Sequence, residues 1–234
     1  MSQRRRIWGW FFYDWACQPF YTLMLTFFFA PYFATVAADY FIASGMETEV
    51  SKAKAQTMWS ICLSASGLFI GISAPILGAI ADTSGRRMPW IYVFSLMLIL
   101  GAMGTWVGVP DGSNLTLMLY FFALGYIGTE FALIFTNAQL TTLGNQGEIG
   151  KISGSGFGFG YLGGVFALAI ALLFLVEQPS GRTFMLGIEP LFGFLDSEQM
   201  EGTRFVGPLA AIWFVIFAIP YFRNIKDDPA LLNK

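Results

Sequence analysis

The sequence predicts an all-α integral membrane protein that crosses the bilayer six times, and its composition and apolar segments lead to this prediction. Apolar residues make up 56% of the 234 residues and charged residues only 12%, and the mean hydropathy is +0.61. Soluble domains carry about 25% charged residues, so this chain lacks the charge to cover itself in water. The deficit extends along the whole chain, in segments close to the roughly 20 apolar residues that a membrane-spanning helix needs.

Six segments meet this length, and we expect one helix in each and a single bundle over residues 1–234. They cover residues 10–36, 59–80, 90–109, 115–135, 157–176 and 205–222. The first is longer than a bilayer requires, which predicts a tilt or an interfacial turn. It follows basic residues as a secretory signal would, but it far exceeds the apolar run of about 7–15 residues in such a signal. It also contains Asp14. We interpret it as a retained helix.

The distribution of Lys and Arg predicts the orientation. Nine of these residues lie at the N-terminus, in the 81–88 and 138–152 loops and in the tail: Arg4, Arg5, Arg6, Arg86, Arg87, Lys151, Arg223, Lys226 and Lys234. The opposite side has four: Lys52, Lys54, Arg182 and Arg204. Cytoplasmic loops carry the excess of basic residues. We therefore expect both termini in the cytoplasm and the chain in a bacterial inner (plasma) membrane.

Missing residue types limit the chemistry of the chain. It has no histidine, which excludes histidine-ligated metal sites and Ser–His or Cys–His catalysis. Cys17 and Cys62 both fall within apolar segments, which argues against a disulfide framework. No basic run is long enough to predict nucleic-acid binding. We expect no enzyme activity, no metal and no cofactor, and the lipid bilayer as a partner.

A polar stripe runs along the first apolar segment. Gln18, Thr22 and Thr26 follow Asp14 at steps of four residues, which places them on one side of a helix. An Asp within a span costs about 2.5–3.5 kcal/mol on insertion scales, so such residues are functional candidates. The alternative is that Asp14 caps the first helical turn near Arg4–Arg6.

The fourth segment carries a second acid, Glu130. Tyr126 at i−4 and Asn137 at i+7 lie on the same side of the helix. We expect the path of a substrate or coupling ion along Asp14, Gln18, Thr22, Tyr126, Glu130 and Asn137. The alternative for Glu130 is a structural hydrogen bond to a neighbouring helix.

Two glycine patterns complete the candidate features. Between the second and third segments, Gly78, Asp82, Gly85, Arg86 and Arg87 predict a tight turn that locks or releases neighbouring helices. We expect Asp82 to have no full set of partners within this chain beyond Arg86 and the turn backbone. The simpler interpretation of this loop is an ordinary basic cytoplasmic turn. Gly156, Gly160 and Gly164 step by four along the fifth segment and predict close helix packing, although such a seam also permits helix bending.

These motifs carry a family resemblance that covers essentially the whole chain. The 78–87 loop resembles the G-x-x-x-D-x-x-G-R-R/K loop of the major facilitator superfamily. Tyr13–Phe20 resembles the Y-D-W-A-x-x-P-F first helix of its vacuolar-effluxer-like branch, which includes autophagy-related amino-acid effluxers. Ser153–Gly164 is similar to the S-G-x-G…G-Y-L-G-G fifth helix of that branch. The chain departs from the branch at residues 139–142, where an L-P-D/E sequence is usual.

The resemblance implies an architecture and a function. Family members have twelve spans in two halves, each half being a 3+3 inverted repeat in which the first and fourth spans line the cavity. It implies that this chain is the N-terminal six-helix half of a secondary transporter for a small solute, an amino acid or similar metabolite. Such a half requires a second six-helix half, a homodimer mate or a larger membrane complex. The alternative is a non-transporting scaffold or accessory subunit derived from such a transporter.

Overall fold

The computed structural model describes residues 2–227, except the side chain of Ser84, and this part of the chain is helical with no strand longer than an isolated bridge. Lys234, counted above in the tail, lies outside the described residues. In chain order the elements are α1 (Gln3–Pro19), η1 (Phe20–Phe27), α2 (Phe29–Ala43), α3 (Thr48–Ser84), α4 (Met88–Gly104), η2 (Thr105–Val107), α5 (Leu115–Ala138), η3 (Leu140–Thr142), α6 (Gln146–Ile170), η4 (Ala171–Leu175), η5 (Pro190–Gly193), α7 (Glu201–Arg204), α8 (Val206–Phe217) and α9 (Ile219–Asn224).

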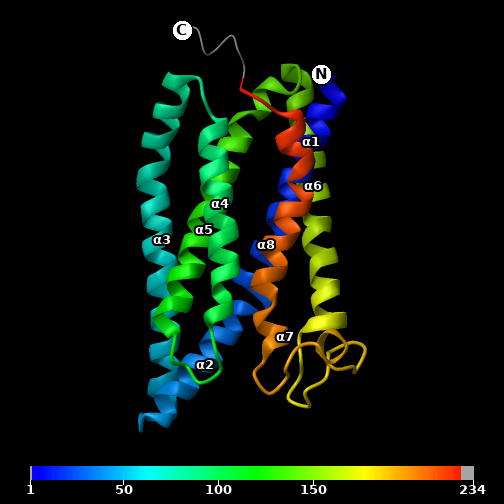
Figure 1. Ribbon diagram of the computed structural model, residues 1–234. Coiled ribbons are helices and arrows are strands. Elements are labelled where there is room, and N and C mark those ends of the chain that lie inside the picture. Colours follow the sequence, from blue (N-terminus) through cyan, green and yellow to red (C-terminus); the bar gives the residue numbers. More distant parts are fainter. Residues whose placement is uncertain (1, 228–234) are drawn as a thin grey trace.

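Six helical stretches in the described residues are long and apolar enough to cross a membrane, as predicted. The first consists of α1, η1 and α2, and the last of α7, α8 and α9. The start of α1 and the end of α9 lie at the same end of the bundle (Figure 1). Six crossings therefore return the chain to the side on which it began.

Several helices extend beyond the predicted apolar segments because their first turns are polar but still helical. α3 begins at Thr48 rather than at residue 59, and an exposed Glu49–Lys52 ion pair of 3.0 Å spans its first turn. α6 begins at Gln146, where Asn145 and Glu148 form a capping box. Hydropathy detects the membrane-embedded part of a helix and not its wetted ends.

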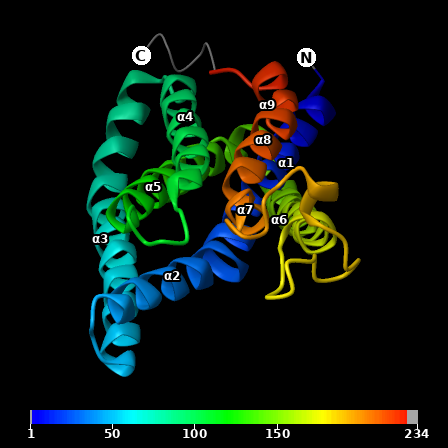
Figure 2. The same ribbon diagram turned by 60° about the horizontal axis from the view of Figure 1, so that its bottom comes forward.

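Two sets of helices in the bundle each pack closely. In one set, α1 of the first span packs against α6, α8 and α9, and in the other, α4 packs against α5. A side chain at Gly101 of α4 would overlap the backbone of Gly125 in α5, so these two helices approach through glycine. α3 lies at one edge and contacts α2 and α5 (Figure 2). Much of its surface is exposed, as expected for a helix that faces lipid or another protein.

A proline changes the helix type within the first span. Pro19 has no N–H to donate to the carbonyl of Trp15, four residues earlier. That carbonyl instead accepts a hydrogen bond of 3.2 Å from Trp213 Nε1 in α8. The chain continues from Pro19 into the π-helix η1, in which more residues make up each turn. The first span is thus tied to the last span where its own hydrogen-bond ladder is interrupted.

Candidate functional site

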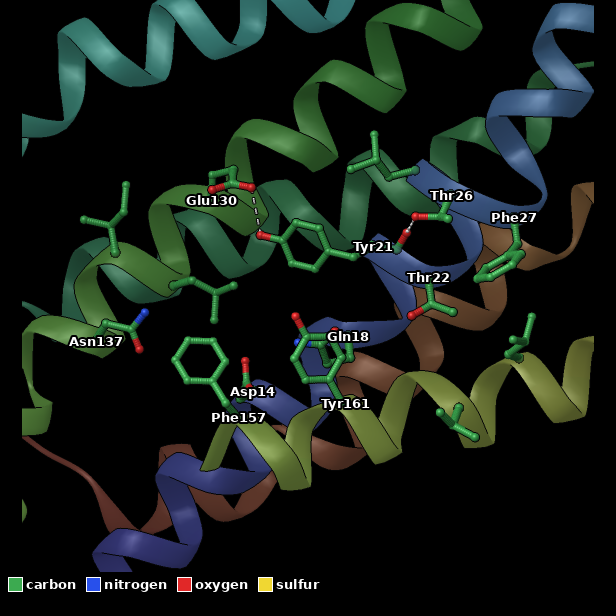
Figure 3. A pocket seen from close by; sticks show the side chains of 15 residues that line it. Asp14, Gln18, Tyr21, Thr22, Thr26, Phe27, Glu130, Asn137, Phe157 and Tyr161 are labelled. Atoms are coloured by element: carbon green, nitrogen blue, oxygen red, sulfur yellow. Dashed lines mark hydrogen bonds between the residues drawn. The ribbon is translucent and has the colours of Figure 1, made fainter. Parts of the chain in front are cut away.

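A groove of about 740 Å³ runs along the first, fourth and fifth spans (Figure 3). All of its lining residues come from α1, η1, α5 and α6. They are Asp14, Gln18, Tyr21, Thr22, Leu25, Thr26, Phe27, Glu130, Leu133, Ile134, Asn137, Phe157, Tyr161, Val165 and Leu168. The set contains two carboxylates and no Lys or Arg. Its volume lies within the range of small-molecule sites.

Most residues of the predicted path line this one groove. Asp14, Gln18 and Thr22 come from the first span, and Glu130 and Asn137 come from the fourth. Tyr126 is not among the lining residues. Its ring stacks on Phe122 of the same helix, with centroids 6.0 Å apart.

Sequence reasoning missed four aromatic lining residues, Tyr21, Phe27, Phe157 and Tyr161. Tyr21 follows Asp14 by seven residues, two α-helical turns, and this spacing could have identified it. Tyr21 and Thr26 both lie in the π-helix η1, where Thr26 Oγ1 donates to the carbonyl of Tyr21, five residues earlier, at 3.0 Å. Phe157 and Tyr161 lie next to the glycine seam of α6, which drew attention only as a packing feature.

The two carboxylates of the groove have different partners. Glu130 Oε1 accepts a hydrogen bond of 2.9 Å from the Tyr21 hydroxyl (Figure 3). This is the bond to a neighbouring helix that was the alternative for Glu130. Asp14 is only 7% exposed, yet its Oδ2 has no hydrogen-bond partner among the described residues. α1 begins at Gln3, so Asp14 lies well inside the helix and cannot cap its first turn.

The three glycines of the seam in α6 all face the first span. A methyl group at Gly156 would meet the ring of Trp10, one at Gly160 would overlap Asp14 Oδ2, and one at Gly164 would overlap Thr22 Oγ1. These positions therefore leave room for large or polar side chains of the first span. Gly154 and Gly158 of the same helix have open space where a side chain would stand.

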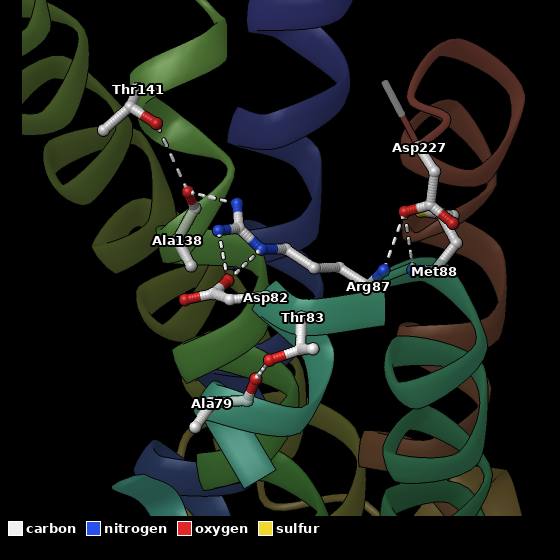
Figure 4. A network of polar contacts seen from close by, with 8 residues as sticks. All are labelled: Ala79, Asp82, Thr83, Arg87, Met88, Ala138, Thr141 and Asp227. Atoms are coloured by element: carbon white, nitrogen blue, oxygen red, sulfur yellow. Dashed lines mark hydrogen bonds and ion pairs between the residues drawn. The ribbon is translucent and has the colours of Figure 1, made fainter. Parts of the chain in front are cut away.

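The turn after α3 holds a second group of predicted residues (Figure 4). α3 ends at Ser84, and its C-cap, Gly85, has a φ of 65°, the left-handed conformation that favours glycine. Asp82 pairs with Arg87 at 2.6 Å. Gly78 lies within α3 with open space beside it.

Arg87 joins this turn to the ends of two other spans. Its Nη1 donates to the carbonyl of Ala138 in α5 at 2.8 Å. The backbone N–H groups of Arg87 and Met88 donate to Asp227 Oδ1, at 2.8 and 3.0 Å. Asp227 follows the last span, so the carboxylate satisfies two N–H groups at the start of α4 (Figure 4). No pattern in the sequence predicts this contact, because Asp227 is far along the chain from the turn.

Six apolar helices long enough to span a membrane, a groove with two carboxylates and the turn after α3 are features expected of a membrane protein of the major facilitator type. The chain belongs to the vacuole effluxer Atg22-like family, whose family model matches residues 2–232.

Two curated relatives resemble the chain. An uncharacterized MFS-type transporter of Bacillus subtilis (strain 168), YxiO, is 24% identical over 222 residues, which cover 94% of this chain and 46% of the relative. An uncharacterized protein of Aquifex aeolicus (strain VF5) is 35% identical over 107 residues, 45% of this chain and 25% of that protein. The chain therefore spans about half the length of the Bacillus transporter. No solved structure shows a significant match to the chain.

Proposed function

We propose that this chain forms one six-helix half of a secondary transporter for a small organic solute, such as an amino acid or similar metabolite. The observation that carries the proposal is the groove of about 740 Å³ with two carboxylates on its walls. Ionisable residues at membrane depth mark the paths of substrates and ions. Membership of the effluxer family and similarity to an MFS-type transporter support the same function.

The proposal includes a second six-helix half that covers the groove. Side chains of only three spans line it, and several of its apolar walls are exposed: Phe27, Phe157, Tyr161 and Val165 are 46–65% exposed. The polar groups on the groove wall would be costly if they faced lipid. A partner chain, an identical copy or a further part of the same polypeptide would each supply the missing wall. We place this assembly in a bacterial plasma membrane, with both ends in the cytoplasm.

A scaffold role is the second candidate, and the hydrogen bond from Tyr21 to Glu130 favours it, because that carboxylate is already engaged with a neighbouring helix. The two functions differ in whether water and solute reach the groove. In a transporter the groove is open to each side of the membrane in turn, whereas in a scaffold a partner fills it permanently.

Cysteine labelling in intact membranes tests this difference. Asn137→Cys places a thiol on the groove wall, and Cys62→Ser removes the partly accessible native thiol, while Cys17 is fully buried. If the chain is part of a transporter, a membrane-impermeant thiol reagent should label this position, and solute should alter the labelling rate. The matched control is Leu98→Cys in α4, a fully buried position outside the groove, which should stay unlabelled. An Asn137→Cys variant that resists labelling from both sides favours the scaffold.

A further inference from the structure

We propose that Asp14, with Gln18 and Thr22, forms the subsite for a primary ammonium group of an organic solute. This inference rests on the proposed function, because it assigns the chemical class of solute that enters the same groove. The two acids then have different roles. The Asp14 carboxylate binds the positive charge of the solute, whereas the Glu130 carboxylate accepts the hydrogen bond from Tyr21.

The first argument is the unsatisfied carboxylate. Only 7% of the surface of Asp14 is exposed, and its Oδ2 lacks any hydrogen-bond partner in residues 2–227. Burying a charge is costly unless it is paired and hydrogen-bonded, and native proteins pair most buried polar atoms. Asp14 Oδ2 is therefore a free hydrogen-bond acceptor on the groove wall.

The second argument is the space kept around that oxygen. A side chain at Gly160 would overlap Asp14 Oδ2, and one at Gly164 would overlap Thr22 Oγ1. Glycine at these two positions of α6 leaves both polar groups in a recess between α1 and α6. Figure 3 shows Asp14, Gln18 and Thr22 along one wall, with Tyr161 and Phe157 beside them. The packing seam thus also preserves the polar atoms of the subsite.

The third argument is the charge balance of the groove. Of its two carboxylates, Glu130 accepts a hydrogen bond from Tyr21, while Asp14 keeps one oxygen, Oδ2, without a donor in the described residues. The lining contains no Lys or Arg. Arg6 and Arg87, which lie toward the end of the bundle that carries η3, are bound to Thr142 Oγ1 and to the carbonyl of Ala138. A cation carried by the ligand would supply the positive charge that the groove lining lacks.

The fourth argument selects an organic ammonium over a metal ion. An ammonium has three N–H donors, which match the Asp14 carboxylate, the Gln18 amide oxygen and the Thr22 hydroxyl. Hard metal cations take six or more oxygen ligands, and in the described residues no three acidic, cysteine or histidine side chains lie close enough together to hold a metal ion. The aromatic walls at Phe157 and Tyr161 favour a cation beside an apolar body.

The test compares three probes of similar size that differ in charge: phenethylammonium, 2-phenylethanol and 3-phenylpropanoate. Binding to the detergent-purified chain is measured by calorimetry at pH 7. We expect the wild type to bind the ammonium about tenfold or more tightly than the alcohol or the carboxylate, the ratio for a charge-assisted hydrogen bond. Asp14→Asn should abolish this preference, whereas Asp39→Asn, an exposed acid outside the groove, should leave it intact.

A glycine pair tests the same subsite without removing the charge. Gly160→Ala fills the space of Asp14 Oδ2 and should weaken ammonium binding about fivefold or more, while Gly158→Ala has open space and should leave it unchanged. This pair keeps the test valid if Asp14→Asn fails to fold. The proposal is overturned if the wild type shows no preference for the ammonium, or if the preference depends on Glu130 and not on Asp14. The proposal is also overturned if sodium ions bind in an Asp14-dependent way and the chain shows no preference for the ammonium.

Binding and transport fail separately. A chain that binds phenethylammonium through Asp14 but carries no solute with a second half refutes the proposed function and retains the subsite. Solute flux without Asp14-dependent ammonium binding does the reverse.

Discussion

The packing of α6 on α1 gives a sharp stability prediction at Gly156. A methyl group added there would overlap Cζ3 of the Trp10 ring and stand 3.0 Å from its Cε3 and 3.1 Å from Phe11 Cδ1. Trp10 is 3% exposed, and its Nε1 donates to the carbonyl of Thr136 in α5 at 3.1 Å. The ring is therefore fixed on two sides and cannot move away without loss of that bond.

The magnitude follows from three terms. Overpacking a well-packed interior costs about 1–3 kcal/mol, and loss of an interhelical hydrogen bond in a membrane protein costs about 0.6 kcal/mol. Replacing glycine by alanine within a helix returns up to about 1 kcal/mol. We expect Gly156→Ala to lose about 1–3 kcal/mol, and Gly158→Ala, which meets no atom, to change between zero and a gain of about 1 kcal/mol.

The free energy of unfolding of both variants is measured by SDS titration in mixed micelles. Two alanine substitutions two residues apart on one helix differ only in what they face, so propensity and detergent effects cancel in the comparison. A gap of about 2–4 kcal/mol in favour of Gly158→Ala supports the packing. Equal stabilities for the two variants would refute the close approach of α6 to Trp10.

Three further predictions concern other parts of the chain. Asp227→Ala removes the acceptor for two N–H groups at the start of α4 and should cost about 1 kcal/mol in the same unfolding assay, while the exposed neighbour Lys226→Ala should change nothing measurable. Burial raises the pKa of the Glu177 carboxyl, which accepts the Thr203 N–H and lies near Glu201. Its protonated form is favoured on folding, so its stabilising contribution is present below the ordinary glutamate pKa and is lost as the pH rises through the raised value. The melting temperature of Glu177→Gln should therefore equal that of the wild type at low pH and exceed it at higher pH; a gain confined to low pH contradicts this. Reporter tags in the 138–152 loop and at either end should read as cytoplasmic and a tag at 47–56 as external, and a tail found outside contradicts the orientation.

Much of the fold could be predicted because lipid imposes a simple requirement on helices. A span needs a fixed length of apolar sequence, so six spans follow from six apolar segments. Their ends could not be predicted in the same way. The first turns of α3 and α6 are polar, and local bonds such as the Glu49–Lys52 pair determine where these helices begin.

The candidate groove was predictable as far as helical spacing reaches. Steps of four residues placed Gln18 and Thr22 with Asp14, and the structure brings these residues to one groove with Glu130 and Asn137. The same spacing failed for Tyr126, because a residue's side of the helix does not say which neighbour it packs against.

Contacts between distant parts of the chain were not predictable from sequence pattern. The Trp213 donor for the carbonyl freed by Pro19 is one example, since the proline reveals that a carbonyl is free but not what satisfies it. The ion pair between Arg87 and Asp82 is another. Both depend on how helices are placed in three dimensions, which helical periodicity does not encode.

Solute flux in proteoliposomes tests the central claim most directly. The chain is reconstituted with and without a second six-helix half, vesicles are supplied with an isotope-labelled amino-acid mixture, and uptake is measured for wild type and Glu130→Gln. Gln keeps the shape and the acceptor for Tyr21 but removes the negative charge. The account predicts saturable uptake by the complete assembly and a clear loss of uptake for Glu130→Gln. Absence of uptake under both conditions, in protein shown to be folded and assembled, would contradict the account and favour the scaffold.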